Sequence, residues 1–414
     1  MRAYKALRAG GVFRGAAMAA ALLFSLTGCV VYDNFAAAFL GAAPADDVVR
    51  IGVFEPLSGA DKEAGELELA GIELAHALYP EVLGKPVELV VADNRSGIDE
   101  AKNAALWLAD RQVSVVLGSY RSTLSLAGGE IFEERGIPAI SVSNSNPLVT
   151  NANDYYFRVR YVESFQGVAI AKYAVEELQT AKAAVMREIG NDFAAAVSQA
   201  FSDKYTALTG DPESVVYTAD YPADMADYSG EFAKIKETGA EVVFLPAAAE
   251  AAVEIVARAQ DSGVQALFLG TDLWEAEALL QAGDSAVTDK MAFSAELGQD
   301  LEQSAPAKEF MAAFREKYGA EAVPAAATAL AFDAYMLARE AIGSAGAGAG
   351  RDAVKTALAK TKSFAGVSGS ITFDENGDPI KSVPIRAVRD GAFVTLYTAE
   401  PNWGEDPEEE PTQG

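Results

Sequence analysis

The chain has 414 residues, with 60 acidic against 33 basic side chains and a formal net charge of −27 at pH 7. So acidic a protein repels phosphate backbones, which excludes nucleic acid as a partner. The single histidine, His76, and the single cysteine, Cys29, leave no parts for serine triads, cysteine dyads or zinc sites. We therefore predict a protein that is not an enzyme and has no cofactor or metal site; an enzyme that uses carboxylates alone is the alternative.

Residues 1–28 have the form of an export signal. Four basic and no acidic side chains occur in residues 1–14, and an apolar run follows at residues 16–24. This run is shorter than the about 20 apolar residues of a spanning helix. Leu26-Thr27-Gly28-Cys29 then resembles the lipobox of bacterial lipoproteins, which implies cleavage before Cys29 and a lipid on that cysteine. An ordinary signal peptide with a chance cysteine is the alternative.

After an alanine-rich tether at residues 29–47, short apolar runs alternate with amphipathic stretches. This alternation predicts a parallel sheet covered by helices on both faces. Leu67, Gly71, Leu74 and Leu78 recur at the spacing of one helix face. The predicted strands are Val48–Phe54, Pro86–Ala92, Val113–Leu117 and Pro138–Val142, and helices are predicted at residues 99–111 and in the stretch that ends at Arg135.

The second half of the chain repeats the scheme, and two such runs make two doubly wound lobes. Its predicted strands are Ala183–Glu188, Val215–Thr218, Glu241–Leu245 and Ala266–Leu269. Its predicted helices are Val168–Leu178, Phe193–Leu208, Tyr228–Lys236 and Glu250–Asp261.

The last third has a different pattern, with two long helices before a run of strands. The helices are predicted at Ala305–Tyr318 and Pro324–Ile342, the loop at Gly343–Gly350, and the strands at Gly369–Phe373, Val383–Arg389 and Ala392–Tyr397, with turns at Asn376-Gly377 and Asp390-Gly391. Such a chain returns to each lobe, and its several crossovers would act as a hinge. We predict lobe one at 48–162 plus 295–364, lobe two at 163–294 plus 365–399, and a disordered acidic tail at 400–414.

Polar loops follow several of the predicted strands of lobe one. They are Glu55–Gly59, Gly118–Thr123 and Ser143–Pro147. Ligands of open α/β sheets bind at the carboxyl ends of strands, and a helix start with hydroxyls and free N–H groups favours an anion. Each loop alone is compatible with an ordinary cap or turn, but two after consecutive parallel strands predict a carboxylate pocket.

Several short motifs occur in a fixed order along residues 48–396. They are Ile51-Gly52-Val53 leading to Leu57-Ser58-Gly59, Gly71, Asp93-Asn94, Gly118–Ser122, Gly136-Ile137-Pro138 before Ser141–Ser145, Gly190-Asn191-Asp192-Phe193, and Gly270-Thr271-Asp272. In this order they resemble the type I periplasmic binding proteins, in particular the leucine/isoleucine/valine-binding branch of ABC importers. The resemblance implies an α/β fold of two Rossmann-like lobes joined by a multi-strand hinge.

The resemblance also implies ligand contacts on both lobes. Ser122 would hold the ligand carboxylate, and Ser143 and Ser145 would offer backbone and hydroxyl groups. Phe193 would stack on the ligand from lobe two, and Asp272 would pair with its ammonium group, as opposite charges require.

Other positions depart from the family pattern. Alanines stand at 64, 194 and 248, where the family has larger aromatic residues or, at 194, glycine. Tyr120 and Arg121 add bulk and charge near the carboxylate site, and Trp274 either lines the cleft or packs at the edge of its lobe. Specificity for branched-chain amino acids is therefore not implied.

The predicted function is capture of an amino acid or similar small carboxylate by an ABC importer. The protein would be a monomer, exported to the periplasm or cell surface, anchored to a membrane through a lipid on Cys29, and docked to a permease in the inner membrane. The alternative is a lipoprotein of the same fold that acts as a sensor or as an activator of a cell-wall enzyme, which the replaced pocket positions motivate.

Overall fold

A computed structural model describes residues 48–282, 285–298 and 304–401. The predicted signal peptide, Cys29, the tether and nearly all of the acidic tail lie outside the described residues. Within those residues, no helix combines the length and the apolar character that crossing a membrane requires.

The first sheet has the strand order β2-β3-β1-β4-β5-β6 and is parallel except for β2. The central strand β1 pairs with β3 on one side and β4 on the other, with Ile51 opposite Leu89 and Val115. This reversal of direction around β1 creates the switch point at which open α/β sheets bind ligands. The strands are β1 (Val49–Glu55), β2 (Glu81–Val82), β3 (Lys85–Asp93), β4 (Val115–Gly118), β5 (Ala139–Ser141) and β6 (Tyr156–Arg158).

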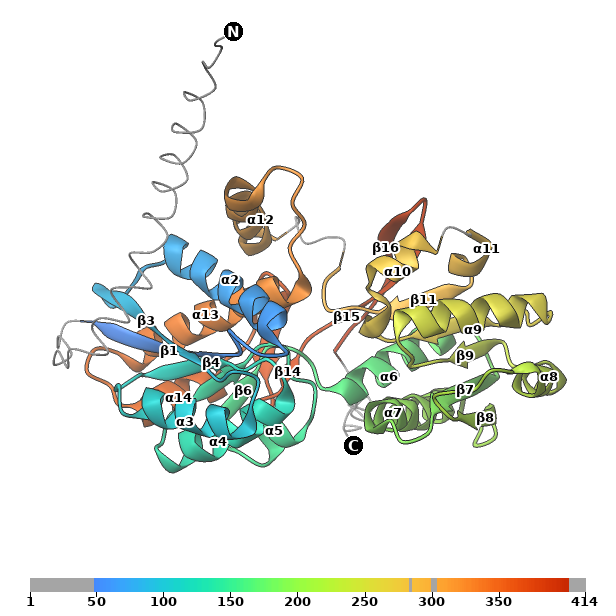
Figure 1. The fold of residues 1–414 in the computed structure, drawn as a ribbon, viewed down its shortest axis with the longest axis horizontal. Coiled ribbons are helices and arrows are strands. Elements are labelled where there is room, and N and C mark those ends of the chain that lie inside the picture. The colour runs from blue at the N-terminus through green and yellow to red at the C-terminus, as the bar shows by residue number, and fades with distance from the viewer. Residues whose placement is uncertain (1–47, 283–284, 299–303, 402–414) are drawn as a thin grey trace, which may run out of the picture. The chain divides into compact units, whose positions relative to one another are not determined.

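Helices cover both faces of this sheet, so that it has two cores. One core gathers side chains from α2, α12, α13 and α14, and the other gathers those from α3 and α4. Figure 1 shows α2 and α13 on the face of the sheet opposite to α3 and α4. The helices are α2 (Lys62–Leu78), α3 (Ile98–Ala109), α4 (Ser122–Glu134), α5 (Leu148–Asn151), α12 (Ala305–Tyr318), α13 (Ala326–Ala345) and α14 (Arg351–Ala359).

The second sheet has the order β16-β15-β11-β10-β9-β7-β8, parallel from β8 to β11 and antiparallel at β15 and β16. Its strands are β7 (Ala183–Glu188), β8 (Val215–Tyr221), β9 (Val242–Phe244), β10 (Leu267–Gly270), β11 (Met291–Ser294), β15 (Val383–Arg389) and β16 (Ala392–Ala399). Its helices are α6 (Glu163–Lys172), the π-helix η1 (Tyr173–Glu177), α7 (Asp192–Thr209), α8 (Ser229–Thr238), α9 (Ala249–Asp261), the 3-10 helix η2 (Asp272–Trp274), α10 (Glu277–Gln281) and α11 (Ser285–Thr288).

A third, small sheet lies in the sequence between β11 and β15, two strands of the second sheet. It consists of β12 (Phe364–Gly366), β13 (Gly369–Phe373) and β14 (Pro379–Ile380). Val367, Ile371 and Phe373 belong to the core of the first sheet. After β11, the chain therefore returns to the second sheet only at Val383, whereas the predicted second segment of lobe two begins at residue 365. The lobe boundaries themselves remain a prediction.

The buried face of α2 differs in phase from the predicted one. Leu67 and Leu78 are 40% and 37% exposed, while Glu68 is fully buried. The reason is close packing at Gly71, where a Cβ would lie 2.1 Å from the carbonyl oxygen of Thr328 on α13. Because the two helix backbones meet at this glycine, the face around it is buried whatever the positions of the leucines.

We expect Gly71→Ala to lower the free energy of unfolding by roughly 1–3 kcal/mol, since the added methyl group meets α13 backbone that cannot move aside cheaply. Gly343→Ala is the control within a helix, because its Cβ would meet only Val82, at 3.8 Å. It should raise stability by about 0.5–1 kcal/mol through helix propensity. Urea unfolding of both variants measures the difference, and equal effects would contradict the packing argument.

Candidate functional site

The predicted loops of the first sheet lie at the switch point beside β1. Ser122 is the first residue of α4 and is half-buried. Tyr120, two residues before Ser122, donates its backbone N–H to Oε2 of Glu55 at 2.8 Å. Glu55 ends β1 and is fully buried. A buried carboxylate of the chain itself therefore lies next to the helix start that was predicted to hold an anion.

The loop after β5 is tied to both neighbouring segments. The side-chain amide of Asn144 donates to the carbonyl oxygen of Ser119 at 2.9 Å. Ser145 Oγ donates to Glu163 Oε2 at 3.4 Å, and the backbone N–H of Glu163 donates to the carbonyl oxygen of Ser145 at 3.0 Å. The structure thus brings the loop that holds Ser143 and Ser145 against the loop before Ser122, as the parallel strands predicted.

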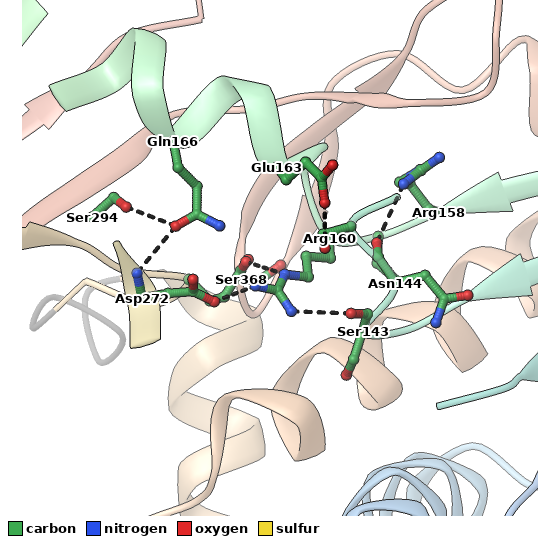
Figure 2. Close-up of polar contacts among 12 residues, drawn as sticks. Ser143, Asn144, Arg158, Arg160, Glu163, Gln166, Asp272, Ser294 and Ser368 are labelled. Carbon is green, nitrogen blue, oxygen red and sulfur yellow. Dashed lines mark hydrogen bonds and ion pairs between the residues drawn. The ribbon is translucent and has the colours of Figure 1, made fainter. Parts of the chain in front are cut away.

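Arg160 is the centre of the polar contacts drawn in Figure 2. Its Nη1 donates to the carbonyl oxygen of Ser143 at 3.0 Å, and its Nη2 forms an ion pair with Asp272 Oδ2. Its Nε lies 2.7 Å from Glu296 Oε1. Ser143 and Asp272 come from different sheets, so a single side chain joins the two predicted halves of the site.

Asp272 is further held by α6. Its backbone N–H donates to Oε1 of Gln166 at 3.0 Å, and the same oxygen accepts from Ser294 Oγ at 2.9 Å. Gln166 is fully buried. Asp272 was predicted to pair with a ligand ammonium group, whereas in the structure its partner is Arg160. Its role toward a ligand remains a prediction.

The two predicted aromatic residues of lobe two lie in different surroundings. Phe193 is half-buried in the first turn of α7. Burial raises the pKa of Glu163, and the nearby charge of Asp192, the residue before Phe193, adds to this rise. Trp274 is fully buried, and its indole N–H donates to the carbonyl oxygen of Ala247 at 3.0 Å. It packs in the core of the second sheet against Gly270, and its place among the ligand contacts remains a prediction.

The sequence analysis missed a buried carboxyl pair beside the site. Glu55 and Glu68 are both fully buried. Burial and the neighbouring charge of Glu68 hold the pKa of Glu55 well above its usual range. Burial raises the pKa of Glu68 to about 7, against the lowering effects of Glu55, Ser143 and Arg160. Two acids this close share protons at neutral pH instead of both ionising.

A signal for these residues was present in the sequence. Glu55 directly follows a buried strand, and Glu68 stands three residues after Gly65 and three before Gly71, on the face that the glycines define. Arg160 follows the short strand β6, which the predicted pattern did not include. Among the described residues, no group of three or more His, Cys, Asp or Glu side chains could hold a metal ion.

The chain is similar to known binding proteins along most of its length. The sequence model of a family described as "Periplasmic binding protein" matches residues 48–392. The Leu/Ile/Val-binding protein homolog 1 of Brucella abortus (strain 2308) is 26% identical over 346 residues, which are 83% of this chain and 90% of that relative.

Solved structures agree with this similarity. The leucine binding protein LivK of Thermotoga maritima MSB8 matches with a TM-score of 0.69 and 31% identity, covering 85% of this chain and 99% of that one. The substrate binding protein LivJ of Streptococcus pneumoniae, solved with isoleucine, matches with a TM-score of 0.66 and 27% identity, covering 84% and 99%. The predicted resemblance and the two-lobed α/β fold class are confirmed.

The raised pKa of Glu68 has a consequence for stability. Between its ordinary value of 4.5 and about 7, the folded state holds a proton that the unfolded state loses, so stability falls as the pH rises through this window. We expect Glu68→Gln to change the free energy of unfolding more favourably at pH 8 than at pH 4.5, with a difference of roughly 2–3 kcal/mol between the two pH values. Urea unfolding at both pH values measures this difference. Glu73→Gln, on the exposed side of α2, is the control, and a Glu68→Gln effect that is equal at both pH values would refute the assignment.

Proposed function

The chain belongs to the periplasmic binding protein family, and from that premise we propose that it is the solute-binding lipoprotein of an ABC importer. It would capture an amino acid or similar small carboxylate between its two lobes and carry out no chemistry on it. The observation that carries the proposal is that Ser143 and Asp272, which follow strands of different sheets, meet at one arginine, Arg160, whose side chain is 17% exposed. A ligand that bridges both lobes stabilises the closed form, because only a difference in affinity shifts such an equilibrium.

The carboxylate of the ligand would bind at the start of α4. Ser122 is the first residue of this 13-residue helix, whose first N–H groups have no partner within the helix. Aligned peptide dipoles favour an anion at this end, and the hydroxyl of Ser122 adds a donor. Ser145 would contribute from the neighbouring loop, and Phe193 would cover the ligand from α7.

The membrane anchor is proposed from the sequence alone. The lipobox-like residues 26–29 would give a lipid-bearing Cys29, and residues 30–47 would link the folded lobes to the membrane. Two acyl-type signals give stable attachment, whereas one chain alone is marginal. The protein would then present its closed form to a permease in the inner membrane.

We expect the purified protein to bind at least one solute from a panel of L-amino acids and of aliphatic and aromatic monocarboxylates in titration calorimetry. Ser122→Ala should weaken that binding roughly tenfold, or ~1.4 kcal/mol, because a hydrogen bond to a charged group is lost. Ser229→Ala is the matched control, since Ser229 is the first residue of α8, a helix that packs against the second sheet. If no solute binds and none is released on denaturation, the transport function is wrong.

We expect Cys29→Ala to abolish incorporation of labelled palmitate and to move the protein from the detergent phase to the aqueous phase in Triton X-114 partitioning. The reason is that the thioether position for the lipid is removed, while the folded lobes are unchanged. Thr27→Ala leaves the cysteine in place and serves as the control. Labelling that persists in Cys29→Ala would overturn the lipid anchor.

A further inference from the structure

The guanidinium of Arg160 lies between two acceptors that come from different sheets (Figure 2). One is the carbonyl oxygen of Ser143, after β5, and the other is Oδ2 of Asp272, after β10. A carboxylate beside a carbonyl oxygen is a combination that would hold the ammonium group of a ligand through charge-assisted hydrogen bonds. In this chain the cation at that position belongs to the protein.

The arginine is fixed in this position by further contacts. Its Nε lies 2.7 Å from Glu296, and the Arg160 side chain is only 17% exposed. Asp272 is 13% exposed and is held through its backbone by the buried Gln166. Withdrawal of the guanidinium would separate the nearly buried Asp272 from its ion-pair partner and would leave Glu296 with the charge of Lys381 alone, which is strongly unfavourable.

From this arrangement we infer that Arg160 excludes ligands that carry an α-ammonium group, so that the site takes small carboxylates without an amino group. This inference rests on the proposed function and names its substrate class. A ligand ammonium group would have to displace the guanidinium from both Ser143 and Asp272. The ammonium group would bind the acceptors that the guanidinium leaves, so the exchange gains little to offset the separation of Arg160 from Asp272 and Glu296.

The remaining acceptor of Asp272 does not change this conclusion. Its Oδ1 has no hydrogen-bond partner among the residues that the structure describes. An ammonium group there would lie beside the guanidinium on the adjoining oxygen, where two cations repel each other. A neutral hydroxyl group of a ligand meets no such repulsion.

Titration calorimetry of the purified chain at pH 7.5 with matched pairs of solutes tests the inference. The pairs are L-leucine and 4-methylpentanoate, L-phenylalanine and 3-phenylpropanoate, and L-aspartate and succinate. In each pair the two compounds differ only by the amino group. For the pair that binds, we expect the compound without the amino group to bind at least tenfold more tightly. Tighter binding of the amino acid would overturn the inference and leave the proposed function intact, whereas no binding of any compound, here or in the wider panel above, would overturn both.

Arg160→Gln provides the second arm of the test. It frees the Ser143 carbonyl oxygen and Asp272. The affinity for the amino acid, relative to that for the compound without the amino group, should therefore rise at least tenfold. Arg386→Gln is the matched control, since Arg386 is 13% exposed and pairs with Glu275, three residues after Asp272. An unchanged ratio in folded Arg160→Gln, checked by circular dichroism, would contradict the inference. Should this variant not fold, the ratios of the unaltered chain decide the question.

Discussion

Charged side chains gather where the chain crosses between its two sheets, and their mutual pairing holds these crossovers together. Arg160, Glu296 and Lys381 lie on three different crossovers, and Glu296 and Lys381 are 5% and 1% exposed. A single buried charge in such a place costs on the order of several kcal/mol, so each requires the others. Arg160 meets Glu296 directly, and the charge of Lys381 lowers the pKa of Glu296 against the effect of burial.

This ionic group also determines what the neighbouring loops can do. Because Arg160 reaches Ser143 on one side and Asp272 on the other, the loops after β5 and β10 are held at a set distance by one side chain. The buried pair of Glu55 and Glu68 adds further acid beside the first of these loops. The site is therefore richer in carboxylates than in cations, and its charge at neutral pH depends on how many of these acids keep their protons.

The sequence predicted the architecture better than the chemistry of the site. Buried parallel strands such as Val115–Gly118 are continuous apolar runs, and period and composition locate them without tertiary information. The phase of α2 was missed because it depends on how closely Gly71 approaches α13, a contact between residues far apart in the chain. Trp274 is buried in the core of the second sheet because its indole fills the space that Gly270 leaves open, which the sequence around it does not show. Likewise, Arg160 has no local signal, because its partners are Ser143, Asp272 and Glu296 from three separate segments.

The order of the elements along the chain has a consequence for when each lobe can fold. One core of the first sheet needs α12, α13 and α14, which begin only at Ala305, and the second sheet is completed by the hairpin of β15 and β16, which ends at Ala399. The core between α3, α4 and the first sheet needs only residues up to Tyr156, whereas the packing on the other face waits for α14. The two faces of one sheet can therefore be completed at widely separated times during synthesis.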